Sequence, residues 1–162
     1  MDKLDYVKIV DTYANDIYRI AYSYCRNQSD AEDIVQNVFL KLLQYNNEFQ
    51  DEEHVKKWLV KVTVNHAKNF CTSFWKKKII SLDTSNSEPQ QQFMAQESSQ
   101  LYEAVMDLPY KYRIVVHLYY YEDYSIREIA EFLNIKETTV QTQLMRARKK
   151  LKLKLKEVWE NE

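Results

Sequence analysis

Basic side chains gather in two stretches of this 162-residue chain, although its net charge is only −1. Residues 54–82 contain seven lysines and no acidic residue, and residues 141–156 contain seven basic residues and again no acid. Lysine and arginine side chains without acidic neighbours are suited to bind the phosphates of a polyanion. The two stretches therefore predict two contacts with nucleic acid. The alternative is a pair of basic helix faces that meet only solvent.

Residues 124–151 carry the strongest local pattern. Ser125 and Glu128 have the spacing of a capping box, in which each side chain binds the other residue's backbone N–H at a helix start. Apolar residues recur every three or four positions on both sides of Asn134, a residue type that tolerates a left-handed turn. Ile135 would fill the corner. The pattern predicts a helix-turn-helix, whose second helix enters the major groove of DNA. The alternative is a plain helical hairpin with a basic tail.

The exposed residues of that second helix are the candidates for reading duplex DNA. Gln suits adenine, Thr suits several bases, and Glu can accept a hydrogen bond from cytosine. The candidates for base contacts are Lys136, Glu137, Thr138, Thr139, Gln141, Thr142 and Gln143. The candidates for phosphate contacts, which would set the register of the protein on DNA, are Arg146, Arg148, Lys149 and Lys150.

A second candidate surface is the lysine- and aromatic-rich stretch WLVKVTVNHAKNFCTSFWKKK, residues 58–78. Lysines follow a phosphate backbone and exposed rings stack on unpaired bases, so this mixture favours single-stranded DNA. Trp58 and Phe70 also fall on the apolar stripe of a helix, and core packing is the alternative for both. The other candidates in this region are Lys56, Lys61, Phe74, Trp75, Lys76 and Lys77.

Helices must position both surfaces. The chain has no glycine and only two prolines, so it lacks the residues that tight hairpins need. Apolar residues at helical spacing predict a first helix over about 10–24. A second helix would open at a capping box of Ser29 and Glu32 and carry an apolar stripe as far as Leu43. A third would begin near His54.

The polar stretch 81–98 is typical of a flexible linker. It would separate an N-terminal helical domain, residues 1–80, from a C-terminal one, residues 99–162. In the second domain a tyrosine-rich helix, roughly 110–122, precedes the helix-turn-helix. We therefore expect an all-α protein of two small helical domains joined by a flexible linker, the C-terminal one containing a helix-turn-helix.

The other reactive side chains form no recognisable catalytic or metal site. Cys25 and Cys71 lie far apart and the three histidines are scattered, so no zinc-ligand spacing exists. No nucleophile–base pair is evident, and we expect neither catalysis nor a cofactor. No apolar run approaches the ~20 residues of a membrane span, and the first residues are unlike a signal peptide. We expect a cytoplasmic protein without membrane insertion.

Three blocks of the sequence together resemble one protein family. They are DAEDIVQNVFLKL (30–42), KKWLVKVTVNHAKNF (56–70) and LPYKYRIVVHLYYYEDYSIREIAEFLNIKETTVQTQLMRARKKL (108–151). In this order and spacing they resemble the extracytoplasmic-function (ECF) sigma factors of bacterial RNA polymerase. The resemblance implies a sigma region 2-like domain, a linker and a region 4-like domain. It implies an alternative sigma factor that binds core RNA polymerase and directs transcription initiation at promoters.

The resemblance also implies a role for each block. The helix at 30–42 would dock on the clamp of the polymerase largest subunit, and the flap is a further expected contact. The core-binding candidates are Asp33, Gln36, Asn37 and Leu40. The loop 46–55 and the helix after it would capture the melted −10 strand, with Asn65, Lys68 and Asn69 as candidates. The helix-turn-helix would read the −35 element as duplex, and an anti-sigma factor is an expected partner.

The chain departs from the family in its recognition helix. Family members often carry the pattern TVKSRLxRAR there, whereas this chain has TVQTQLMRAR, with Gln141 and Gln143 in place of basic residues. This predicts fewer phosphate contacts at those two positions, for which the tail lysines would compensate. The main alternative function is a polymerase-independent, two-domain helix-turn-helix regulator. A second is a nonspecific single-strand-binding or adaptor protein.

Overall fold

The computed structural model describes residues 3–80 and 100–160, with side chains over 5–70 and 100–157. These residues form helices and no strand, which confirms the all-α prediction. The chain divides into two compact units, Met1–Asn86 and Ser87–Glu162. The predicted linker, 81–98, lies outside the described residues. No helix within the described residues has the length and apolarity that crossing a membrane demands.

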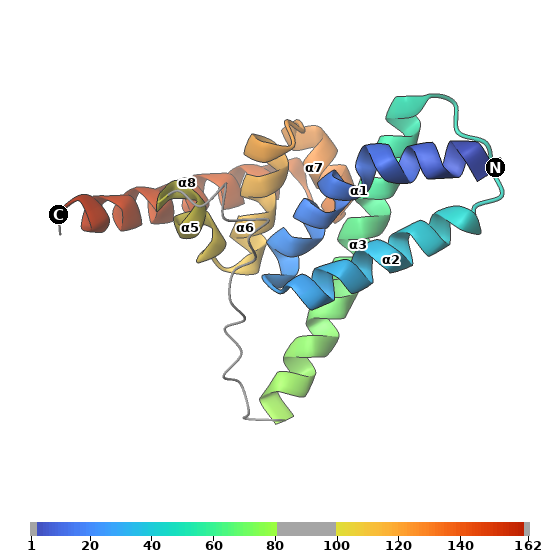
Figure 1. Ribbon diagram of the computed structural model, residues 1–162. Coiled ribbons are helices and arrows are strands. Elements are labelled where there is room, and N and C mark those ends of the chain that lie inside the picture. The colour runs from blue at the N-terminus through green and yellow to red at the C-terminus, as the bar shows by residue number, and fades with distance from the viewer. Residues whose placement is uncertain (1–2, 81–99, 161–162) are drawn as a thin grey trace. The chain divides into compact units, whose positions relative to one another are not determined.

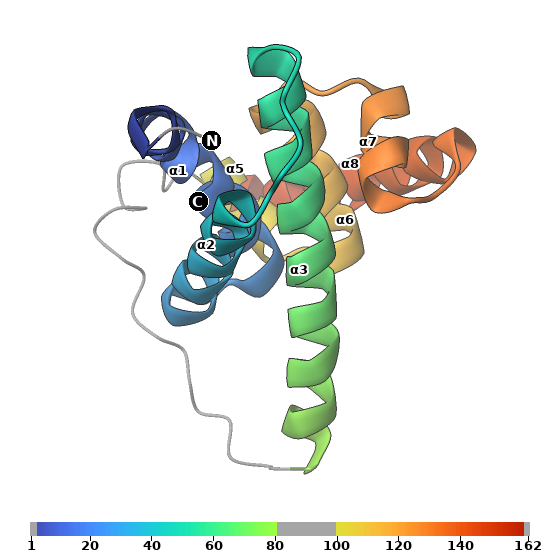
Figure 2. The same cartoon turned by 90° about the vertical axis from the view of Figure 1, so that its right-hand side faces the viewer.

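Three helices build the N-terminal unit: α1 (Lys3–Cys25), α2 (Gln28–Leu43) and α3 (Glu52–Ile80). Each of them packs against the other two (Figures 1 and 2). One aliphatic stripe per helix forms the core, as Ile17, Ile34 and Leu59 illustrate with at most 1% of their surface exposed. The Tyr6 hydroxyl of α1 also donates to the Phe39 carbonyl of α2 at 3.0 Å. This packing leaves the opposite faces of α2 and α3 to the surface.

The junction between α1 and α2 differs from the sequence prediction. Arg26 adopts a left-handed conformation, with φ of 55°, directly after α1. Asn27 is then extended, and its side-chain oxygen accepts a hydrogen bond from the Asp30 N–H at 2.9 Å. Asn27 is therefore the N-cap, and the predicted capping box of Ser29 and Glu32 is wrong. The chain reverses within two residues, so Asn27 meets the free N–H groups of the first turn before Ser29 can.

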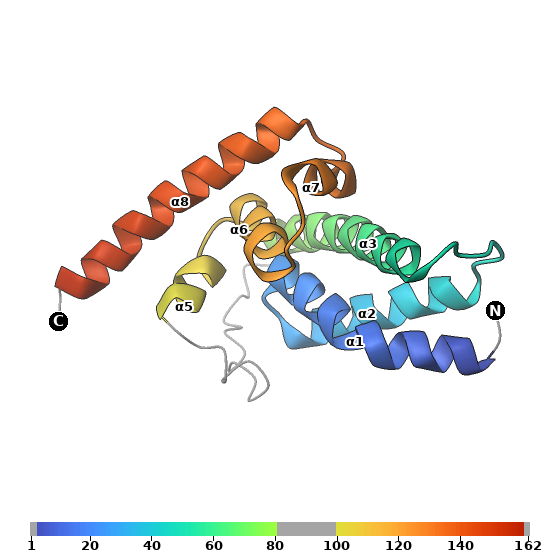
Figure 3. The ribbon, with the colours of Figure 1, turned by 90° about the horizontal axis from the view of Figure 1, so that it is seen from above.

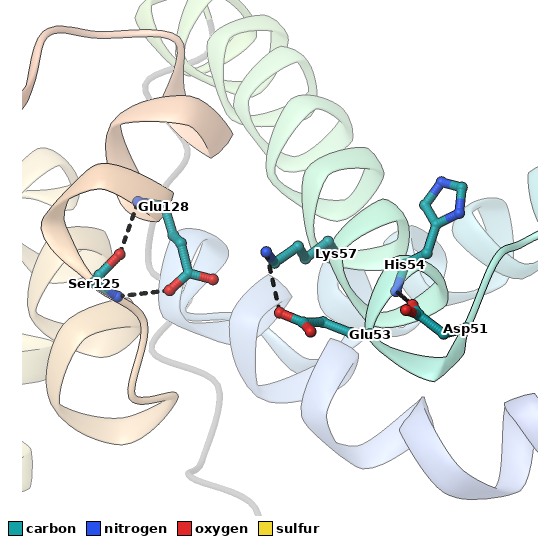
Figure 4. A network of polar contacts seen from close by, with 6 residues as sticks. All are labelled: Asp51, Glu53, His54, Lys57, Ser125 and Glu128. Carbon is teal, nitrogen blue, oxygen red and sulfur yellow. Dashed lines mark hydrogen bonds and ion pairs between the residues drawn. The ribbon is translucent and has the colours of Figure 1, made fainter.

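Two side chains form hydrogen bonds with backbone N–H groups at the start of α3. Asp51 Oδ1 accepts a hydrogen bond from the His54 N–H at 2.7 Å (Figure 4), and His54 Nδ1 accepts one from the Gln50 N–H at 3.1 Å. The contact of Asp51 is that of an N-cap, whereas the histidine ring reaches the N–H of the preceding residue rather than that of Asp51, as it would in a capping box. An exposed ion pair between Glu53 and Lys57, at 3.2 Å, follows one turn later. The helix consequently begins two residues before the predicted His54.

The C-terminal unit contains the predicted helix-turn-helix. Its helices are α5 (Gln100–Met106), α6 (Tyr110–Val116), the π-helix η1 (His117–Tyr121), α7 (Ile126–Leu133) and α8 (Glu137–Glu160). Helix α8 packs against α5, α6 and α7 (Figure 3). The predicted tyrosine-rich helix is confirmed as α6 followed by η1, whose turn is wider than that of an α-helix.

A buried arginine fixes the turn before α6. Arg113 is 5% exposed, and its guanidinium donates to the carbonyls of Met106 and Leu108, both at 3.1 Å. These carbonyls belong to the end of α5 and the turn after it, where no helical N–H reaches them. Pro109 then starts α6. The guanidinium thereby satisfies buried acceptors that would otherwise destabilise the unit.

Candidate nucleic-acid interface

Local geometry defines the two helices of the helix-turn-helix. The Ser125 hydroxyl accepts from the Glu128 N–H and the Glu128 carboxylate accepts from the Ser125 N–H, each at 3.1 Å (Figure 4). Asn134 ends α7 in the left-handed conformation, with φ of 56° and ψ of 48°. The Ile135 N–H then donates to the Ala130 carbonyl at 3.0 Å, as in a Schellman-type ending. Both sequence predictions, the capping box and the left-handed asparagine, are confirmed.

Helix α8 separates a buried face from an exposed one. Val140, Leu144 and Ala147 are at most 1% exposed and hold the helix on the core of the unit. The predicted contact residues that lie exposed are Lys136, Glu137, Thr138, Gln141, Arg146, Arg148, Lys149 and Lys150. Those that lie partly buried are Thr139, Thr142 and Gln143. The helix therefore presents a polar surface that can enter a groove of DNA.

Beside α8 lies a polar groove of about 220 Å³. Its lining residues are Lys111, Tyr112, Thr138, Thr139, Thr142, Gln143 and Arg146. Lys111 and Tyr112 belong to α6, and sequence reasoning missed them because they precede the helix-turn-helix pattern. The Thr142 hydroxyl donates to the Thr138 carbonyl at 2.9 Å, so its oxygen remains able to accept from a ligand.

Arg148 also has partners that the sequence did not suggest. Its Nε donates to the Tyr120 hydroxyl at 2.6 Å, and its guanidinium carbon lies 5.9 Å and 5.7 Å from the ring centroids of Tyr119 and Tyr120. Both tyrosines come from η1. The guanidinium is thus held against the aromatic surface by a hydrogen bond and cation–π contacts.

In the N-terminal unit, an aromatic cluster occupies the loop before α3. We define the loop cluster as Tyr45, Phe49, His54 and Trp58. The Tyr45 ring stacks on Phe49 with centroids 4.6 Å apart, and it lies 4.9 Å from Trp58. Phe49 meets His54 edge-on at 5.2 Å and Trp58 at 5.8 Å. The Trp58 ring is partly buried by these neighbours, which favours core packing over base stacking.

The exposed face of α3 carries most of the remaining single-strand candidates. Lys61, Asn65, Lys68 and Asn69 are exposed. Asn65 lies four residues after Lys61, and the last two lie three and four residues after Asn65, so all four share one helix face. Lys56 and Phe70 are partly buried. The candidates whose side chains lie outside the described residues are Phe74, Trp75, Lys76 and Lys77.

The four polymerase-docking candidates lie together on α2. Asp33, Gln36, Asn37 and Leu40 are exposed on the face opposite the core, with Leu40 at 52%. Leu43, which the sequence assigned to the apolar stripe, is 57% exposed, so that assignment is wrong. It lies three residues after Leu40 and extends the same face. An apolar edge beside polar groups is suited to a protein partner.

Three groups in the N-terminal unit, Tyr13, Tyr18 and His66, have shifted pKa values. Burial, together with the charge of Lys41, lowers the pKa of His66, so the imidazole favours its neutral form. Burial and the neighbouring Tyr22 and Glu32 raise the pKa of Tyr18 to about 12. Within the described residues, no group of three or more His, Cys, Asp or Glu side chains could hold a metal ion.

Comparison with known proteins matches both units. Residues 9–77 match the family model described as "Sigma-70 region 2", and residues 98–151 match "Sigma-70, region 4". The chain is 34% identical to RNA polymerase sigma factor SigV of Bacillus subtilis, covering 92% of this chain and 90% of that one. It is 30% identical to ECF RNA polymerase sigma factor SigM of the same species, covering 90% and 91%. The chain therefore belongs to the sigma-70 family of RNA polymerase sigma factors, in the ECF group.

A solved structure supports the fold. The sigma factor RpoE of Bartonella quintana, solved in complex with the anti-sigma factor NepR, matches with a TM-score of 0.71 at 21% identity. The match covers 94% of this chain and 97% of that one. The family models and the relatives identify an alternative sigma factor for promoter-specific transcription, and they disfavour a polymerase-independent regulator.

Proposed function

We propose that this protein brings core RNA polymerase to its promoters by reading DNA at two places. The observation that carries the proposal is the pair of polar faces on α8 and α3, each on the exposed side of a helix whose other side is core. Helix α8 would read a −35 element as duplex. The exposed face of α3 and the loop before it would bind the −10 element as a single strand. Catalysis would be left to the polymerase.

At the −35 element, the proposed contacts divide by position along α8. Glu137, Thr138 and Gln141 lie near its N-terminal end, which reaches base edges in this motif. Their carboxylate, hydroxyl and amide groups can recognise cytosine, several bases and adenine respectively. Arg146 and Lys149 lie one to three turns further and are suited to phosphates, which position the helix without selecting a sequence.

At the −10 element, we assign different tasks to the aromatic and polar residues. The loop cluster would keep the loop 46–48 in one shape, so that its exposed residues can receive an unpaired base. Lys61 and Lys68 would follow the strand through its phosphates, while Asn65 and Asn69 can hydrogen-bond to base edges. Contact with DNA by Phe74, Trp75, Lys76 and Lys77 stays a prediction from the sequence.

We propose that α2 is the main contact with core polymerase. Asp33, Gln36 and Asn37 offer hydrogen-bonding groups, and Leu40 offers an apolar anchor on the same face. A buried apolar anchor with a polar rim is the usual anatomy of a protein interface. The clamp of the largest subunit would take this face, and the flap would contact the C-terminal unit.

The similar RpoE is bound by an anti-sigma factor, so we propose that a partner of this kind covers one of these surfaces when the protein is inactive.

The sigma factor itself would act in the cytoplasm, where the chromosome is transcribed. We propose domain limits of 1–80 and 99–162, with 81–98 as the linker between the two domains. No cofactor is required for any of these contacts.

Run-off transcription with purified core polymerase and genomic DNA tests the proposal. We expect new start sites that appear only when the protein is added, each preceded by shared −35 and −10 elements. Opening DNA costs roughly 1.4 kcal/mol of stacking per base step, which a small free protein cannot supply. The free protein should therefore bind promoter duplex weakly. The absence of any new start site would overturn the proposal, and a nanomolar, sequence-specific gel shift by the free protein would contradict its dependence on polymerase.

A further inference from the structure

Tyrosines of α6 and η1 contact cations on both flanks of α8. On one flank, Arg148 donates its Nε hydrogen to the Tyr120 hydroxyl at 2.6 Å and lies over the rings of Tyr119 and Tyr120. Arg148 and Tyr120 are 28 residues apart in sequence. Both side chains are exposed, with Tyr120 at 50%. The contact therefore lies on the surface of the C-terminal unit rather than in its core.

The geometry leaves the Nη groups of the Arg148 guanidinium available to bind an anion. The Tyr120 hydroxyl takes the Nε hydrogen, whereas the Nη groups carry the other donors of the fork. Among the described residues, Arg148 forms no ion pair. A cation held over two rings loses less side-chain freedom when it meets an anion, so its contact is stronger than that of a mobile side chain.

On the other flank, Tyr112 supports two lysines. Lys111 Nζ lies 5.1 Å and Lys150 Nζ 5.8 Å from the centroid of its ring. Tyr112 itself is only 7% exposed, which fixes the position of the ring. Lys150 is two residues from Arg148, and two residues correspond to about 200° around an α-helix. The two tyrosine-held groups of cations therefore lie on opposite flanks of α8.

These flanks border the face that carries the proposed base contacts. The polar groove next to Lys111 includes Thr142 and Arg146 of α8, so the cations and the reading face are continuous. When a helix lies in the major groove, which is about 12 Å wide, a phosphate backbone runs along each of its sides. Cations on both flanks match that arrangement of negative charge.

We propose that Tyr112, Tyr119 and Tyr120 are positioning residues that hold Lys111, Lys150 and Arg148 against the two phosphate backbones beside the −35 element. The inference rests on the proposed function of α8 and extends it to residues of α6 and η1. Lys111 and Lys150 lie outside the family pattern TVKSRLxRAR, so their phosphate contacts would offset the basic residues that Gln141 and Gln143 replace.

The test uses holoenzyme and a promoter located by run-off transcription, with binding measured across a range of salt concentrations. Arg148→Gln should weaken binding roughly tenfold and reduce the salt slope by about 0.9, because one phosphate contact is lost. Lys111→Gln should reduce the slope in the same way from the other flank. Arg148→Lys keeps the charge and should retain the slope.

A double-mutant cycle separates positioning from folding. Tyr120→Phe keeps the ring but loses the hydroxyl, and should weaken binding about two- to threefold in the wild-type protein. The same substitution should have no effect in the Arg148→Gln background, because the guanidinium that the Tyr120 hydroxyl positions is then absent. Tyr6→Phe, which removes a tyrosine hydroxyl bond in the N-terminal unit, is the matched control and should leave the slope unchanged.

The outcomes distinguish this inference from the proposed function. An unchanged slope in Arg148→Gln would overturn the phosphate contact on the first flank, and an unchanged slope in Lys111→Gln would overturn it on the second. A Tyr120→Phe loss that persists in the Arg148→Gln background would show a structural role instead. If wild-type holoenzyme forms no promoter-specific complex, the proposed function fails first.

Discussion

Aromatic side chains have opposite tasks in the two units of this sigma factor. In the N-terminal unit, Tyr45, Phe49 and Trp58 turn toward one another and close the loop before α3. In the C-terminal unit, the exposed Tyr120 and the partly buried Tyr119 lie under Arg148. The first arrangement removes apolar surface from water, whereas the second orients a charge. Sequence composition alone does not distinguish these tasks, because both regions mix rings with basic residues.

The two aromatic clusters differ because one stabilises a loop, whereas the other lies on a helix. Residues 44–51, between α2 and α3, are not helical. The shape of this loop therefore depends on side chains, and rings provide a large contact area at low entropic cost. Tyr119 and Tyr120 are already fixed by η1. Their rings are free of that structural task and can support a neighbouring cation.

The largest expected effect tests this contrast directly. Trp58→Ala should lower the free energy of unfolding by about 2–3 kcal/mol, because the loop cluster loses its largest ring. Tyr120→Ala should change stability by no more than about 0.5 kcal/mol, because its ring is half exposed. Urea denaturation of the two variants measures both values. Equal losses would break the comparison, and Trp58→Phe is the control that should retain most of the stability.

A smaller effect is expected at the two capped helices. Ser125→Ala in the C-terminal unit and Asn27→Ala in the N-terminal unit should each cost about 1 kcal/mol, because each loses an observed cap. Ser29→Ala should cost only a few tenths of a kcal/mol, since Ser29 lies inside the first turn of α2. Denaturant unfolding compares the three variants. A loss at Ser29 as large as that at Asn27 would contradict the observed cap.

The smallest effect concerns pH and the N-terminal unit. Burial and Lys41 hold the pKa of His66 below its usual 6.5 in the folded protein. The unfolded chain therefore binds the proton more tightly, and stability falls as pH drops from about 6.5 through the folded pKa. Above that window His66 is neutral in both states and contributes no pH dependence.

Two variants check the cause of this pH dependence. His66→Asn should flatten the stability profile between pH 5 and 7 (roughly the window set by an imidazole). Lys41→Gln should raise the pKa of His66, because a nearby positive charge is removed. An NMR titration of the His66 ring measures this shift, and an unchanged pKa would exclude Lys41 as a cause.

Where neighbours in sequence make the contacts, the sequence was sufficient to predict the structure. Ser125 and Glu128 are three residues apart and close a capping box whatever packs around them. Asn134 ends α7 in a left-handed turn because few other residue types tolerate it. Helical periodicity predicted the buried and exposed faces of α8. It therefore also predicted the exposed contact candidates between Lys136 and Lys149. The blocks that resemble ECF sigma factors identified the family by the same local means.

Contacts between distant residues were decided only by the tertiary structure. Asn27 replaced Ser29 as the cap because α1 reverses into α2 through Arg26, and that reversal depends on how the two helices pack. Trp58 is partly buried because its ring contacts Tyr45 and Phe49. Arg148 met Tyr120 across 28 residues of chain. The spacing of apolar residues predicts which face of a helix is buried. Tertiary packing determines which residues that face contacts, and which residues contact a charged side chain beside it.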